Sequence, residues 1–184
     1  MIKAVIFDRH GVLDKVTGET LIATMQQYVP HLTTETIKKK LKNPRSQYDL
    51  GILDPGDFRA IVQQKLQLTE QETQRCIDHL LTVQPIQELR NIIPDLQKSY
   101  TLGILSDCPK DKKNIINKQY NNLPEFTYKF WSCDYTKTKS QGKEFFEIMY
   151  MYLHQEQKIE KPEQILFVDD TLSNVQHAQH LEMA

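Results

Sequence analysis

The chain has 184 residues, 39% of them apolar and 26% charged, which suits one domain with a modest insertion and excludes disorder driven by low hydrophobicity. The formal net charge of −1 gives no electrostatic case for nucleic acid or an anionic membrane surface, and no apolar run approaches the roughly 20 residues of a membrane span. Three scattered cysteines argue against a disulfide framework and a zinc site, so we expect a cytosolic protein.

The first predicted element is a strand over residues 3–7, where the apolar run KAVIF stops at Asp8. Continuous apolarity is typical of a strand that is buried on both faces of a parallel sheet. We therefore expect Asp8 at the carboxyl end of a central strand.

The next roughly 90 residues contain no strand pattern and are too long for a single crossover helix. Thr33 or Thr34 is a candidate N-cap for a helix that runs through Leu41, and Asp54 precedes a proline that suits a helix start. The TEQE sequence that begins at Thr69 is a capping box for another helix.

These signals predict an all-helical insertion over residues 15–85 that can roof the carboxyl edge of the sheet. The α/β core then comprises residues 1–14 and 86–184, with a helix over 86–97 that returns the chain to the sheet. Within the insertion, the run KKK at 38–40 is most simply a solvated helix face.

Two further strands end in small polar or acidic residues. Residues 100–105, YTLGIL, precede Ser106 and Asp107, and residues 164–168, QILFV, precede Asp169 and Asp170. Residues 126–131 are a more amphipathic fourth candidate, and a helix follows the last strand. This pattern predicts a doubly wound parallel sheet with its chemistry at the carboxyl edge. Such a sheet usually continues, so we expect one more strand beyond the end of this chain.

Four segments carry a family resemblance in their order and spacing. They are FDRHGVLD at 7–14, LSD at 105–107, KSQGKEFF at 139–146 and FVDDTLSNV at 167–175. Together they resemble the four motifs of the haloacid dehalogenase superfamily of aspartate-nucleophile hydrolases. The resemblance implies a Rossmann-like core with a small helical cap inserted after the first strand.

The resemblance also implies a Mg²⁺ site and a reaction. Asp8, Asp169, Asp170 and the backbone carbonyl of His10 would ligate the cation, and hard carboxylate ligands suit Mg²⁺. Asp8 would become a phospho-aspartate that water then hydrolyses.

Other residues would serve the substrate. Ser106 and Asp107 would bind it, and Lys139 would neutralise charge on the phosphoryl group and hold the carboxylates. Lys137 and Lys143 are rivals for the lysine role, because the segment after Lys139 departs from the family pattern.

His10 stands where the family's phosphatases have a second aspartate that acts as general acid and base. An imidazole can transfer protons in principle, but it is bulkier and would lie near the cation. The leading hypothesis is a Mg²⁺-dependent phosphatase for a small phosphorylated metabolite, with reduced or altered activity. The alternatives are a catalytically inactive protein that binds a ligand or a protein partner, and a hydrolase of C–halogen or C–P bonds.

Several residues stay secondary candidates. His177 and His180 share one helical face without an evident third metal ligand, so we expect surface or packing roles for them. Tyr48 and Phe58 in the cap are candidates for substrate selection. We expect a monomer or a weak homodimer.

Overall fold

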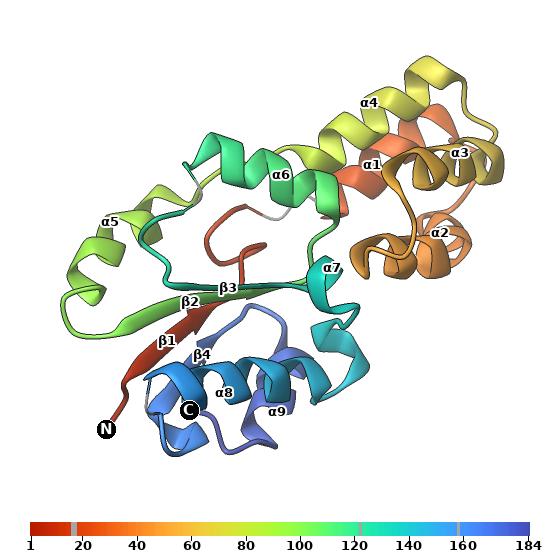
Figure 1. The fold of residues 1–184 in the computed structure, drawn as a ribbon. Helices are drawn as coiled ribbons and strands as arrows, with labels where there is room; N and C mark the ends of the chain where they lie inside the picture. Colours follow the sequence, from red (N-terminus) through yellow and green to blue (C-terminus); the bar gives the residue numbers. More distant parts are fainter. Residues whose placement is uncertain (16–17, 122, 158) are drawn as a thin grey trace.

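The computed structural model describes residues 1–15, 18–121, 123–157 and 159–184 (Figure 1). Its core is a sheet of strands β1 (Ala4–Phe7), β2 (Thr101–Ser106), β3 (Tyr128–Trp131) and β4 (Ile165–Val168). The strands are all parallel and lie in the order β3-β2-β1-β4. The predicted α/β fold with a helical insertion after the first strand is confirmed.

The register of the strands decides which residues meet at the carboxyl edge. Phe7 of β1 pairs with Ile104 of β2 on one side and with Val168 of β4 on the other. The residues that follow these positions therefore leave three adjacent strands at the same level of the sheet. Functional side chains that are about 60 to 160 residues apart in sequence become neighbours in this way.

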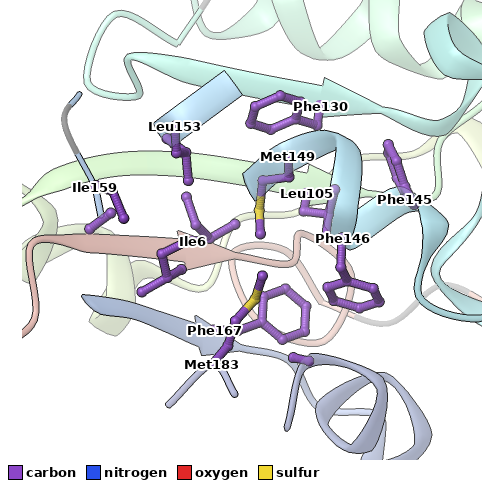
Figure 2. Close-up of a cluster of buried hydrophobic side chains, with 13 residues drawn as sticks. Ile6, Leu105, Phe130, Phe145, Phe146, Met149, Leu153, Ile159, Phe167 and Met183 are labelled. Atoms are coloured by element: carbon purple, nitrogen blue, oxygen red, sulfur yellow. The ribbon is translucent and has the colours of Figure 1, made fainter. Parts of the chain in front are cut away.

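Helices cover both faces of the sheet, as a buried parallel sheet requires. Helices α8 (Glu144–Gln157) and α9 (Leu172–Gln179) pack on one face, where Ile6 meets Phe146 and Met149 (Figure 2). Helices α5 (Gln87–Leu96) and α6 (Lys110–Gln119) cover the opposite face, where Phe7 is buried. The alternation between Ile6 and Phe7 follows from the period of two in a strand.

The helical insert comprises α1 (Gly18–Tyr28), α2 (Thr34–Asp49), α3 (Pro55–Leu66) and α4 (Glu70–Leu81), and Figure 1 shows it at one end of the sheet. It has an apolar cluster of its own, separate from the two clusters on the sheet. Thr33 and Thr69 cap α2 and α4 through their side chains, the second in a reciprocal capping box with Glu72. Asp54 precedes α3 without a side-chain capping bond.

Helix α2 extends beyond the predicted stretch through Leu41, because it continues through Pro44 to Asp49. A proline inside a helix removes a hydrogen bond and costs about 3 kcal/mol or more. Burial of Pro44 and of Tyr48, whose ring stacks on Phe58 with centroids 4.1 Å apart, offsets this cost. The extra turns carry α2 as far as the edge of the sheet.

The insert is hydrogen-bonded to the core. The hydroxyl of Tyr48 donates to the Asp111 carboxylate of α6 at 2.5 Å, and Nζ of Lys112 donates to the carbonyl of Leu80 at 2.9 Å. Ser132, at the start of the short helix α7 (Ser132–Tyr135), donates to the carbonyl of Asp49 at 2.5 Å. These contacts hold α2 and α4 against the core.

Two chain crossings connect the insert to the core side by side. The amide of Lys15 donates to the carbonyl of Gln84 at 2.8 Å, and the amide of Ile86 donates to the carbonyl of Leu13 at 2.9 Å. The division of the chain at residues 15 and 85 as domain boundaries stays a prediction.

Ala184 lies beside the outer edge of β4. The amide of Phe167 donates to the carbonyl of Ala184, and the amide of Ala184 donates to the carbonyl of Ile165, both at 3.0 Å. The further strand expected from the sequence stays a prediction. In the part of the chain that the structure describes, no helix has the length and apolarity needed to cross a membrane.

Candidate active site

Three acidic side chains meet at the carboxyl edge of the sheet. Asp8 follows β1, and Asp169 and Asp170 follow β4; a carboxylate oxygen of each lies within 4.8 Å of the other two. The amide of Arg9 donates to Oδ1 of Asp8 at 2.6 Å, which fixes the orientation of that carboxylate.

Gly11 makes room for this cluster. It has a φ of 83°, and a Cβ at this position would lie 2.0 Å from a carboxylate oxygen of Asp170. Any other residue would be strained and would displace the Asp170 side chain.

Lys139 is the buried cation of the cluster. It begins the 3₁₀ turn η1 (Lys139–Gln141), and its Nζ lies 2.7 Å from Asp8 and 2.6 Å from Asp169. Burial opposes the charged form, but Asp8, Asp107 and Asp169 together raise the pKa of Lys139. The side-chain amine of Lys139 is therefore protonated at neutral pH.

The two rival lysines point elsewhere. Lys137 pairs with Glu144 and Lys143 pairs with Glu147, both in ion pairs that solvent reaches. Of the three candidates from the sequence, Lys139 is the one that the structure brings to Asp8.

Asp8 is nine-tenths buried, and this burial raises its pKa. Lys139 opposes the rise, and the neighbouring Asp169 adds to it. Like charges at this distance repel, so a further cation would favour the ionised form of the cluster.

Residues at the start of α9 hold Asp169. The amide of Thr171 donates to Oδ1 of Asp169 at 2.8 Å, and Nδ2 of Asn174 lies 3.1 Å from both carboxylate oxygens. Thr171 and Asn174 come from the segment that the sequence singled out as the fourth motif.

Ser106 and Asp107 end β2 at the same edge. Ser106 is fully buried, and its hydroxyl oxygen has no hydrogen-bond partner in the described part of the structure. A buried hydroxyl without a partner is costly, which points to a ligand that completes it. Asp107 accepts a hydrogen bond from the backbone amide of Lys139 at 2.9 Å, and burial raises its pKa to about 7.

His10 also lies at this edge of the sheet, beside several cationic side chains. Burial lowers the pKa of His10 to about 2, and the charges of Lys112, Arg45 and Arg9 add to this effect. The imidazole is therefore neutral at physiological pH. A neutral imidazole is a poor proton donor, unlike the carboxylic acid that the family pattern has at this position.

The donor set fits Mg²⁺. Three carboxylates from two adjacent strand ends offer hard oxygen ligands, and Asp170 is exposed enough to leave room for water. These are the same residues that the sequence proposed as ligands together with the carbonyl of His10.

A cavity of about 280 Å³ lies over these residues; we call it the edge cavity. Besides Asp8, Asp107 and Lys139, it is lined by Arg45 and Asp49 of the insert. Nε of Arg45 donates to the Asp49 carboxylate at 2.7 Å. Neither residue was predicted from the sequence, because Pro44 conceals the continuation of α2.

His177 also has a place at the site that the sequence did not predict. Its Nδ1 hydrogen-bonds the carbonyl of Lys139 at 3.0 Å, and its ring packs on the edge of Phe146. His177 therefore supports the turn that carries Lys139. Tyr48 is buried and bonded to Asp111, whereas Phe58 lines a second cavity, described below.

No family model and no curated protein matches this chain. Solved structures do match it over its full length. A haloacid dehalogenase (HAD) family enzyme from Bacteroides thetaiotaomicron is 19% identical to this chain, with a TM-score of 0.77, and the match covers 91% of that enzyme. A structure of that enzyme in complex with magnesium and inorganic phosphate has a TM-score of 0.74, at 19% identity and over 92% of its chain.

Two other structures show the same likeness. A predicted HAD-like hydrolase from Porphyromonas gingivalis is 22% identical, with a TM-score of 0.74 over 89% of its length. An L-2-haloacid dehalogenase from Xanthobacter autotrophicus is 17% identical, with a TM-score of 0.66 over 76% of its length; both matches cover 100% of this chain. The chain therefore has the fold of the haloacid dehalogenase enzymes, with a helical insert after the first strand.

Proposed function

We propose that this chain is a Mg²⁺-dependent hydrolase of phosphate monoesters that uses Asp8 as its nucleophile. The observation that carries the proposal is the pairing of Asp8 with Lys139 in the edge cavity. The adjacent strand β2 ends at the same edge of the sheet in Ser106, whose buried hydroxyl has no hydrogen-bond partner among the described residues. A phosphoryl group that entered this cavity would meet a nucleophile and a cation, and we assign the hydrogen bond to one of its oxygens to the nearby Ser106.

The reaction would proceed in two displacements. A carboxylate oxygen of Asp8 attacks phosphorus, and the P–O bond to the leaving group breaks with its electron pair going to oxygen, so that an aspartyl phosphate and an alkoxide or phenoxide form. The leaving oxygen then takes a proton from water. Water then attacks the phosphorus of the aspartyl phosphate, which releases inorganic phosphate and restores Asp8.

The chain's own residues have separate tasks in this scheme. Ser106 donates a hydrogen bond to a phosphoryl oxygen, and Lys139 offsets the negative charge between Asp8 and the phosphoryl group. Asp8, Asp169, Asp170 and the His10 carbonyl would hold Mg²⁺, which when bound neutralises charge that would otherwise repel the nucleophile from the substrate. Asn174 and Thr171 keep Asp169 oriented.

His10 limits the protonation of the leaving group. The imidazole is held neutral among cations and is a weak acid in that form. We therefore propose reduced activity toward esters whose leaving group must be protonated, and better activity toward esters with acidic leaving groups.

Hydrolysis of p-nitrophenyl phosphate with Mg²⁺ and with EDTA tests the proposal. We expect turnover that requires Mg²⁺ and is absent in Asp8→Asn, because an amide cannot form the phospho-enzyme. Asp95→Asn, an exposed acid paired with Lys98, is the matched control and should keep full activity. Turnover in Asp8→Asn equal to that of the unaltered chain would reject Asp8 as the nucleophile.

A second candidate is a ligand-binding protein without turnover, which the neutral His10 favours. Binding of inorganic phosphate with Mg²⁺, in the absence of hydrolysis of any ester, would identify it. The three clustered carboxylates favour a metal-dependent phosphoryl reaction over metal-free cleavage of a C–halogen bond.

A further inference from the structure

A second cavity, which we call the insert groove, opens beside the edge cavity. Its volume is about 680 Å³, within the range of small-molecule sites. Arg45, Asp49 and Asp107 line both cavities, so the groove is continuous with the site around Asp8. A ligand that had its phosphoryl group in the edge cavity could extend its remaining atoms into the groove.

The inner wall of the groove is apolar. Leu21 and Met25 of α1, Leu41 of α2 and Phe58 of α3 form the buried base of this wall, and the partly buried Ile22 of α1 gives it accessible apolar surface. These side chains come from three helices of the insert and belong to one apolar cluster. The wall is suited to an aromatic or aliphatic part of a ligand.

The α2 side of the groove carries positive charge. Lys39, Lys42 and Arg45 recur every three residues, and Lys38 lies four residues before Lys42, so all four lie on the side of the helix that lines the groove. Lys38 pairs with Glu35, and Arg45 pairs with Asp49.

Lys39 and Lys42 are different, because neither has a carboxylate partner among the side chains that the structure describes, which leave out residues 16–20, 122, 157 and 158. At about 1.5 Å of helix rise per residue, Lys42 lies roughly 4.5 Å and Lys39 roughly 9 Å along α2 from Arg45. The uncompensated charge is therefore at the part of α2 that is remote from Asp8. The sequence predicted a solvated helix face for residues 38–40, and in the structure Lys38 and Lys39 of this run line the groove.

We infer that the insert groove selects phosphate monoesters with an apolar leaving group that carries a second negative charge at its far end. The apolar part contacts Leu21 and Ile22 of α1, and Lys39 and Lys42 attract the distal anion, which is a carboxylate or a second phosphate. This inference rests on the proposed hydrolase function and adds the chemical class of its substrate.

Two matched esters test the inference: 4-(2-carboxyethyl)phenyl phosphate and 4-ethylphenyl phosphate. They release phenols of nearly equal acidity and differ in the distal carboxylate, so His10 affects both alike. We expect kcat/KM to be roughly tenfold higher for the carboxylate ester at low ionic strength, since two exposed charge pairs contribute modestly. The preference should shrink with added salt.

The variant Lys39→Gln/Lys42→Gln should reduce that preference, the ratio of kcat/KM for the two esters, to about one. The control Lys40→Gln/Lys118→Gln removes the same charge from exposed lysines that do not line the groove, and it should keep the preference. Equal kcat/KM for the two esters, or a preference that survives in Lys39→Gln/Lys42→Gln, would overturn the inference.

Binding of the two product phenols separates this inference from the proposed function, since it requires no turnover. Titration calorimetry should give tighter binding of 3-(4-hydroxyphenyl)propanoate than of 4-ethylphenol, and Lys39→Gln/Lys42→Gln should abolish the difference. If neither ester is hydrolysed but this difference is found, the hydrolase proposal fails and the groove assignment stands. If the esters are hydrolysed but the phenols bind alike with no kinetic preference, the groove assignment fails alone.

Discussion

Nζ of Lys139 lies 2.7 Å from Oδ2 of Asp8, and both side chains are more than nine-tenths buried. The same ammonium also contacts Asp169 at 2.6 Å, so one cation offsets the charge of two buried carboxylates. Removal of this cation leaves both carboxylates without their compensating charge.

Lys139→Ala should therefore lower the free energy of unfolding by about 3–5 kcal/mol, the usual cost of breaking a buried ion pair. Urea denaturation in EDTA measures the change. Lys137→Ala, which removes a solvent-accessible pair with Glu144, should cost less than about 1 kcal/mol. Equal losses in the two variants would contradict the role of Lys139 as the charge partner of the cluster.

Mg²⁺ should stabilise the folded chain by about 2.7 kcal/mol when its concentration is 100 times the dissociation constant. The reason is that Asp8, Asp169 and Asp170 converge in the folded state alone. Thermal denaturation with and without Mg²⁺ measures this gain. Asp169→Asn and Asp170→Asn should lose most of it, whereas Asp95→Asn should keep it; an undiminished gain in Asp169→Asn would place the cation elsewhere.

His10→Asp should increase turnover of phenyl phosphate by at least about tenfold and of p-nitrophenyl phosphate by less, because the first leaving group needs a proton donor. In the unaltered chain, burial lowers the pKa of His10 to about 2, so the rate should show no titration of an imidazole near 6.5. Steady-state kinetics over pH 5–8 measures both effects. Lower activity in His10→Asp would show that the histidine is adapted to another chemistry.

Asp107→Asn should change how stability depends on pH. Burial raises the pKa of Asp107 to about 7 in the folded state, whereas the unfolded value is near 3.9. The folded chain therefore binds the Asp107 proton more tightly than the unfolded chain does. The stability that this proton contributes is lost as pH rises from the unfolded to the folded pKa, by at most about 1.4 kcal/mol per pH unit. An asparagine keeps the acceptor for the Lys139 amide but does not titrate.

The difference in unfolding free energy between Asp107→Asn and the unaltered chain should thus grow in favour of the variant from pH 5 to pH 8. Urea denaturation in EDTA at each pH measures it. Parallel pH profiles for the two proteins would show that Asp107 is ionised throughout this range.

Tyr48→Phe should weaken the attachment of the insert to the core. The Tyr48 hydroxyl is buried and donates to Asp111, so its loss should cost about 1–3 kcal/mol. A double-mutant cycle with Asp111→Asn should give a coupling energy of that order. Additive effects of the two substitutions would mean that the pair does not link α2 to α6.

Local sequence was sufficient to predict the strands and the polar residues at their carboxyl ends. The apolar runs that end at Asp8, Ser106 and Asp169 are continuous, and parallel strands bring their carboxyl ends to one edge whatever the connections between them. Thr33 and Thr69 likewise identify helix starts, since a capping bond joins residues three apart.

Tertiary packing alone decided the other parts of the site. Three lysines within seven residues have the same local chemistry, and Lys139 differs from Lys137 because the turn after β3 aims it at the distant Asp8. Arg45 reaches the edge cavity because burial in the insert maintains α2 beyond Pro44, against its local propensity. The sequence pattern by itself therefore determined which polar residues end the strands. Contacts between residues far apart in the chain determined which cations, Lys139 and Arg45, lie beside them.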